Sequence, residues 1–125
     1  MRARTATEGD RPVDLAALAR TGQPAGPIWS RQSEDLSLNL VVFAAGNGVA
    51  EHVNAEVDVL LVGVAGEGVV EVDGRALPLP PGHALLVAKG ARRATRAVAG
   101  HFAYLTCHRR RDGLVPSVGR RAGGR

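Results

Sequence analysis

Polar and apolar residues alternate along much of the chain between residues 35 and 108, and this period of two predicts β strands. Over residues 36–43, four apolar side chains share one face, which we expect to be buried. They are Leu36, Leu38, Leu40 and Val42. Further strand-length segments follow at 57–64, 69–72, 76–79, 84–88, 92–98 and 102–108. Short strands at this spacing, without helical patterns between them, predict an antiparallel sandwich or a small barrel.

Glycine-containing segments separate the predicted strands and mark the places where the chain is expected to turn. They are Gly46-Asn47-Gly48, Gly66-Glu67-Gly68, Asp73-Gly74, Pro80-Pro81-Gly82, Lys89-Gly90 and Ala99-Gly100. The Asp73-Gly74 pair is a strong hairpin signal, because both residue types tolerate the backbone angles of a tight two-residue turn. We therefore expect a strand to end at each of these segments.

The residues before 34 follow a different pattern, which predicts one short helix. Pro12 and Asp14 suit the start of this helix and Gly22 suits its end. Residues 22–27 contain two prolines and two glycines, so we interpret them as a linker that brings Trp29 to the domain. The sequence therefore predicts three parts: an N-terminal extension at 1–33, a barrel at 34–111 and a disordered basic tail at 112–125.

The charge of the chain is strongly asymmetric. Residues 1–88 carry a net charge of −5 and residues 89–125 carry +9, within a total of +4 for 125 residues. Such a basic end can attract phosphates by releasing counterions. Aromatic residues make up only 3% of the chain, so a surface on which bases could stack is poorly supplied. We therefore expect no nucleic-acid partner, with RNA or DNA binding by the basic tail as the alternative.

Cysteine content and hydropathy point to a cytoplasmic protein. A single cysteine, Cys107, excludes an intramolecular disulfide framework, and we expect it to be a buried thiol. The longest segment without a charged side chain, residues 36–50, has 15 residues and is too short to span a bilayer as a helix. The first residues contain no apolar segment like that of a secretory signal. We expect no membrane partner.

Two frames of regularly spaced glycines carry the most specific signal in the sequence. In the first frame, five residues separate Gly46 from His52, and the frame closes at Gly66. Glycines at such positions mark turns that need unusual backbone angles, while alternate residues of the strands between them point into a barrel.

The second frame repeats this arrangement. Five residues separate Gly82 from the segment 88–90, and two more lead to Arg93. With both frames, residues 35–111 resemble the cupin superfamily, and specifically a small single-domain cupin whose metal-binding motifs are degenerate. The resemblance implies an all-β fold, a small double-stranded β-helix or jelly-roll barrel, with a short N-terminal extension and a disordered basic C-terminal tail.

The resemblance also implies where a metal would bind, and the sequence departs from that pattern. In metal-binding cupins three histidines and one glutamate hold a divalent cation, and of these four this chain keeps His52. Asn54 occupies the second histidine position and Arg93 the third. The glutamate position falls on Val59, or on Asp58 after a shift of one residue. Because a guanidinium cannot bind a cation, we expect the usual site to be lost and no cofactor to be present.

The remaining polar residues define a candidate ligand-binding site. If residues 52–58 stay extended, the side chains that point inward are His52, Asn54, Glu56 and Asp58, together with Arg93. One interpretation is that Arg93 closes the barrel by an ion pair with Glu56 or Asp58. The other is that Arg93 binds the carboxylate or phosphate of a small ligand.

These interpretations lead to three hypotheses about function. The leading one is a binding protein for a small anionic molecule, with Arg93 as the anchor. The second is a metal-dependent isomerase or dioxygenase in which His52 and Asp58, with Glu56, hold a divalent metal. The third is an interaction protein with a closed barrel. By analogy with small cupins we also expect a homodimer, with the region of Trp29 as a candidate contact.

Overall fold

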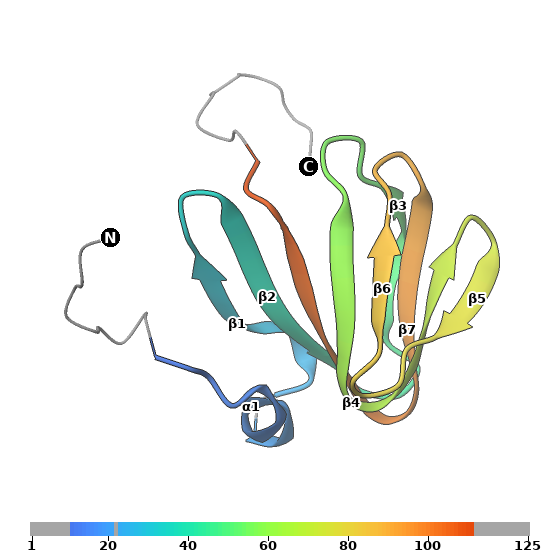
Figure 1. The fold of residues 1–125 in the computed structure, drawn as a ribbon. Coiled ribbons are helices and arrows are strands. Elements are labelled where there is room, and N and C mark those ends of the chain that lie inside the picture. The colour runs from blue at the N-terminus through green and yellow to red at the C-terminus, as the bar shows by residue number, and fades with distance from the viewer. Residues whose placement is uncertain (1–10, 22, 112–125) are drawn as a thin grey trace, which may run out of the picture.

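The computed structural model describes residues 11–21 and 23–111, which form one short helix and seven antiparallel β strands (Figure 1). The elements are α1 (Leu15–Thr21), β1 (Ala25–Gln32), β2 (Leu36–Phe43), β3 (Gly48–Val53), β4 (Val59–Val72), β5 (Arg75–Pro78), β6 (Ala84–Val87) and β7 (Arg92–Arg109). The all-β prediction and the short N-terminal helix are confirmed. Asp14 caps that helix, since its Oδ1 accepts a hydrogen bond from the backbone N–H of Ala17 at 3.1 Å.

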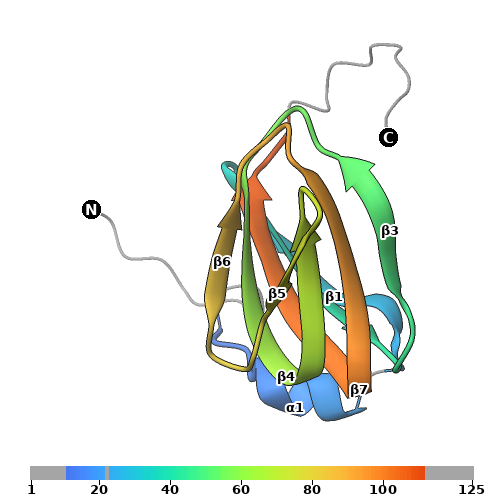
Figure 2. The ribbon, with the colours of Figure 1, turned by 90° about the vertical axis from the view of Figure 1, so that its right-hand side faces the viewer.

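Two long strands, β4 and β7, pair with each other, and every other strand except β1 pairs with one of them. The second half of β7 pairs with β2, and the first half of β4 pairs with β6, while β1 extends this layer at the far side of β2. The first half of β7 pairs with β3, and the second half of β4 pairs with β5. Figure 2 shows β3 and the first half of β7 on one side of the barrel and β6 on the other.

The turns predicted at Gly66-Glu67-Gly68 and Ala99-Gly100 are wrong, because β4 and β7 continue through these segments without ending. Both segments are bulges: the pairing register shifts near residues 63–68, and Gly66 and Gly100 have φ angles of 74° and 62°. Each long strand thereby bends from one layer into the other without ending. In the sequence, a glycine-containing segment looks the same whether it ends a strand or bends it.

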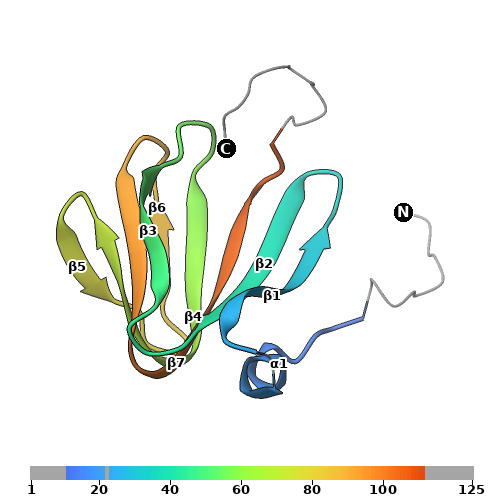
Figure 3. The same cartoon turned by 180° about the vertical axis from the view of Figure 1, so that it is seen from behind.

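The linker predicted at 22–27 is also wrong in its second half, because residues from Ala25 onward form the edge strand β1 beside β2 (Figure 3). Pro27 is tolerated there because an edge strand needs only one side of its backbone for pairing, and the register shifts between Pro27 and Trp29. Trp29 is half-buried, with the Arg31 guanidinium 5.2 Å from its ring centroid. The predicted end of the helix at Gly22 and the predicted disordered tail lie outside the described residues.

The main core lies between the two layers. Its buried members are Val41, Val57, Val59, Leu61, Val70, Leu79, Val87, Ala97, Phe102 and Tyr104. Because β2 alternates regularly, Ser37 and Asn39 share the inward face of β2 with Val41. Ser37 is accordingly only 7% exposed, whereas Leu36 on the opposite face is 45% exposed. The expectation that the leucine face of β2 is the buried one is therefore wrong at this end of the strand.

Helix α1 explains why the other end of that outer face is nevertheless buried. Ala19 of the helix packs with Val42 of β2 and Ala103 of β7 in a second, smaller cluster. The short helix covers only this end of the layer. Leu40 and Val42 on the outer face are fully buried, whereas Leu36 at the start of β2 is 45% exposed. Within the described residues, no helix has the length and apolar character needed to cross a membrane.

Candidate functional site

The strand pair β3–β7 brings His52 and Arg93 together as register partners. An N–H of the Arg93 guanidinium lies 3.1 Å from Nε2 of His52, and Nδ1 of His52 lies 3.0 Å from the carbonyl oxygen of Ala50. Because a guanidinium can only donate, Nε2 must accept, and the ring proton must sit on Nδ1 and point to Ala50. The contact with Arg93 therefore holds His52 as one neutral tautomer.

Arg93 is a half-buried cation without an acidic partner. Within residues 11–21 and 23–111, the ion pairs that involve arginine are Arg96 with Glu71 and Arg111 with Glu56, and Arg93 has no carboxylate within reach. Burial lowers the pKa of the Arg93 guanidinium, while nearby Tyr104 acts in the opposite direction and Arg111 adds to the lowering. The first of the two interpretations, an ion pair of Arg93 with Glu56 or Asp58, is therefore wrong.

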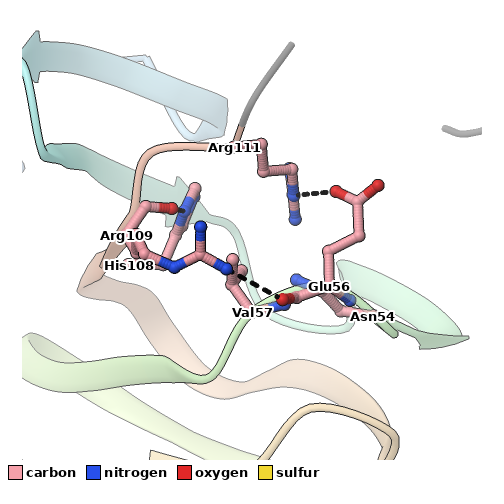
Figure 4. A network of polar contacts seen from close by, with 6 residues as sticks. All are labelled: Asn54, Glu56, Val57, His108, Arg109 and Arg111. Carbon is pink, nitrogen blue, oxygen red and sulfur yellow. Dashed lines mark hydrogen bonds and ion pairs between the residues drawn. The ribbon is translucent and has the colours of Figure 1, made fainter. Parts of the chain in front are cut away.

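The loop of residues 54–58 explains where the predicted carboxylates go (Figure 4). The Oδ1 atom of Asn54 accepts hydrogen bonds from the backbone N–H groups of Glu56 at 3.0 Å and Val57 at 3.3 Å, which curls the chain after β3. The Glu56 carboxylate then pairs with Nε of Arg111 at 3.0 Å. Residues 52–58 are thus not extended, and the prediction that alternate residues of this segment line the barrel is wrong for Glu56, as it is for Asp58.

Asp58 is likewise turned away from Arg93. Its Oδ1 accepts a hydrogen bond of 2.8 Å from the backbone N–H of Lys89, which ties the loop before β4 to the turn before β7. The backbone carbonyl of Asn54 accepts from the N–H of Gly90 at 2.8 Å and reinforces the same connection. Asp58 therefore serves the structure of this loop rather than the candidate site.

Asn54 keeps one feature that fits a binding site. Its Nδ2 atom is buried and has no hydrogen-bond partner among the described residues. A buried amide donor without a partner costs about 1–3 kcal/mol, so this atom favours a ligand or water molecule beside it. Of the five predicted site residues, the structure brings His52 and Arg93 into direct contact and places Asn54 directly after β3, the strand that carries His52.

Sequence reasoning missed two residues that complete the surroundings of Arg93. The hydroxyl of Tyr104 lies 2.8 Å from Oγ1 of Thr95 in the buried interior, and these two side chains come from the two halves of β7. Burial raises the pKa of Tyr104, while the hydrogen bond from Thr95 and the charge of Arg93 lower it. The alternation of side chains along β7 was the signal that could have placed Tyr104 on the inward face of that strand.

Because Tyr104 is the single tyrosine of the chain, its ionisation can be followed directly by ultraviolet absorbance. We expect it to ionise in the folded protein above the ordinary pKa of about 10. Since the unfolded chain then loses its phenolic proton first, the contribution of Tyr104 to stability is constant below about pH 10 and falls as pH rises from there toward the folded pKa. Urea denaturation of the native chain and of Tyr104→Phe checks this, and equal pH dependence of both proteins contradicts it.

The residues present do not fit the metal that the cupin resemblance implies. Among the described residues, no group of three or more His, Cys, Asp or Glu side chains is placed to hold a metal ion. The Nε2 lone pair of His52 accepts from Arg93, and Asp58 is engaged with the backbone of Lys89. A guanidinium next to the histidine would also repel a cation.

Comparison with known proteins identifies the fold. No protein-family model and no curated protein matches the chain. A solved cupin superfamily protein from Desulfitobacterium hafniense is 26% identical, with a TM-score of 0.66, covering 86% of this chain and 96% of that one. A double-stranded β-helix domain protein from Klebsiella pneumoniae has a TM-score of 0.68 at 14% identity, covering 86% and 91%.

A third structure, KdgF from Halomonas sp., is 22% identical, with a TM-score of 0.63, covering 70% of this chain and 81% of that one. These similarities and the bent long strands agree on one architecture. The chain has the cupin fold, a double-stranded β-helix, as the two glycine frames predicted.

Proposed function

We propose that this cupin-fold protein binds a small anionic molecule in its barrel, with Arg93 as the anchor. The observation that carries the proposal is the half-buried guanidinium of Arg93, which has no carboxylate partner in the described part of the chain. A cation withdrawn from water gains most from an anion that restores its lost solvation. An incoming carboxylate or phosphate would supply that partner.

The neighbours of Arg93 support the same chemistry. His52 holds one N–H of the guanidinium and leaves the others for a ligand. The unpartnered Nδ2 of Asn54, directly after the strand that carries His52, is a further donor. In this proposal Arg93 supplies charge, His52 fixes the orientation of the guanidinium, and Asn54 adds a neutral hydrogen bond.

Binding of acetate and of inorganic phosphate, followed by NMR in the native chain and in Arg93→Met, tests the proposal. We expect saturable shifts around His52 and Arg93, and a loss of affinity of about tenfold to a hundredfold in the variant, as for a charge-assisted hydrogen bond. Arg96→Met is the matched control, because Arg96 lies on the same strand but pairs with Glu71 in solvent.

This experiment and two further measurements separate the proposal from the other two hypotheses. Equal affinity in Arg93→Met and the native chain contradicts Arg93 as the anchor. A stoichiometric divalent metal in purified protein, with binding abolished by a chelator, would instead favour the metal-dependent enzyme. Salt-dependent binding of a polynucleotide that is lost on deleting residues 112–125 would favour the basic tail as the functional element.

A further inference from the structure

An open groove of about 820 Å³ lies beside β1, β2 and the end of β7, and its lining does not include His52 or Arg93. This volume is in the range of sites for small molecules. The described side chains that line it are all polar or cationic. They are Ser30, Arg31, Gln32, Ser37, Asn39, His108, Arg110 and Arg111.

The strand register arranges three of these residues as a compact group on the inward face of the layer. Ser37 of β2 is directly opposite His108 of β7. Asn39 follows two positions along β2 on the same face, about 7 Å from Ser37. A single small molecule can therefore contact all three side chains at once.

Each of the three side chains keeps one hydrogen-bonding group that no described residue uses. Asn39 accepts from the Ser30 hydroxyl at 2.6 Å through Oδ1, which leaves its amide N–H groups. Ser37 accepts a long hydrogen bond from Nε2 of Gln32 at 3.4 Å, which leaves its O–H. Two donors are thus available on β2.

His108 supplies the complementary acceptor. Its Nδ1 lies 2.9 Å from the backbone carbonyl oxygen of Arg109 and must donate to it, so in the neutral ring the proton sits on Nδ1 and Nε2 carries a free lone pair (Figure 4). A carboxylate or phosphate has no proton to offer this lone pair. A hydroxyl group both donates and accepts, and so matches His108 together with the donors of β2.

The charge of the groove selects among hydroxylated molecules. Among the described residues no acidic side chain lines the groove, and Arg110 and Arg111, which directly follow β7, are part of its lining. Arg111 is neutralised by Glu56 at 3.0 Å, whereas Arg110 donates to the backbone carbonyl of Ser33 at 3.2 Å and meets no carboxylate within the described residues. A net positive potential therefore remains for an anion.

We propose that this groove is a second binding site, which takes a small molecule carrying several hydroxyl groups and one anionic group. The hydroxyl groups contact Ser37, Asn39 and His108, and the anionic group lies toward Arg110. Arg93 does not line the groove, which has its own cations and its own donors and acceptor.

Three six-carbon probes separate the two requirements: gluconate has hydroxyl groups and a carboxylate, hexanoate has the carboxylate alone, and sorbitol has hydroxyl groups alone. Amide chemical shifts of the native chain locate each probe, at residues 30–39 and 106–110 for the groove or around His52 and Arg93. We expect gluconate to perturb the groove saturably and to bind about tenfold or more tightly than either of the other probes, as one good polar interaction predicts.

Single substitutions then measure how much each groove residue contributes to gluconate binding. His108→Phe removes the acceptor and Arg110→Gln removes the charge, and each should weaken gluconate binding by about tenfold. Arg96→Gln is the charge control outside the groove, and Arg93→Met should leave the groove affinity within about twofold. Unchanged thermal unfolding shows that each variant is folded, and Asn39→Ala provides an independent test if His108→Phe is not.

Gluconate shifts confined to His52 and Arg93 would overturn the groove site and leave the proposed function standing. Groove shifts that persist in Arg93→Met, with no anion binding at Arg93, would support the groove and contradict the proposed function. Equal binding of hexanoate and gluconate would reduce the groove to a basic surface, and absence of groove shifts at saturating probe would exclude the site.

Discussion

Gly66→Ala should destabilise the protein by about 3 kcal/mol or more, whereas Gly100→Ala should cost only about 1–2 kcal/mol. Both glycines lie in the bends of the long strands, with similar left-handed φ angles of 74° and 62°. An alanine at either position therefore carries a similar conformational penalty. The two positions differ in what surrounds the added methyl group.

A Cβ atom on Gly66 would collide with the backbone carbonyl oxygen of His101, whereas nothing lies within 4 Å of a Cβ on Gly100. A backbone atom in the paired strand cannot move aside without breaking the pairing of β4 with β7 at the bend. Urea denaturation of both variants measures the difference. Equal destabilisation would show that the bend can relax, and would contradict a fixed contact at Gly66.

Phe102→Ala should lower the free energy of unfolding by about 3–5 kcal/mol, because it removes a large ring and leaves a cavity in the core. Phe102 is fully buried, and its ring centroid lies 5.0 Å from that of Tyr104. A Cβ on Gly68 would overlap the Phe102 ring, so glycine is needed there for the ring to approach the backbone.

Chemical denaturation of Phe102→Ala measures this loss, and Phe102→Leu is the matched control. Leucine fills much of the space, so the control should lose clearly less stability than the alanine variant. The absorbance titration of Tyr104 gives a second measurement. It reports the burial of the phenol, to which the ring of Phe102 contributes. A loss below about 1.5 kcal/mol in the alanine variant would mean that the core collapses around the gap.

The fold could be predicted from the sequence because its signals are local. Alternation identified most strand segments, and the Asp73-Gly74 pair marked the hairpin between β4 and β5, where Asp73 has a φ of 49°. The spacing of Gly46, His52 and Gly82 indicated the cupin frame. Each of these signals depends on backbone angles or on a period of two, which neighbouring residues fix by themselves.

The candidate site could be predicted only in part. The sequence indicated that His52 and Arg93 share a site, and the pairing of β3 with β7 brings their side chains to 3.1 Å. It also assigned Asn54, Glu56 and Asp58 to that site, on the assumption of an extended segment. The side chain of Asn54 curls the loop instead, and an Asx turn competes with a strand in a way that alternation alone does not reveal.

By itself, the sequence determined most of the strands and the glycine frames. Only the tertiary structure decided which face of β2 points inward, since a leucine face and a serine face are both compatible with a strand. It also decided that Arg93 meets His52 rather than an acid, and that His108 lies beside Ser37. These contacts join residues far apart in the chain, so they depend on how the long strands bend and pair, which no local pattern encodes.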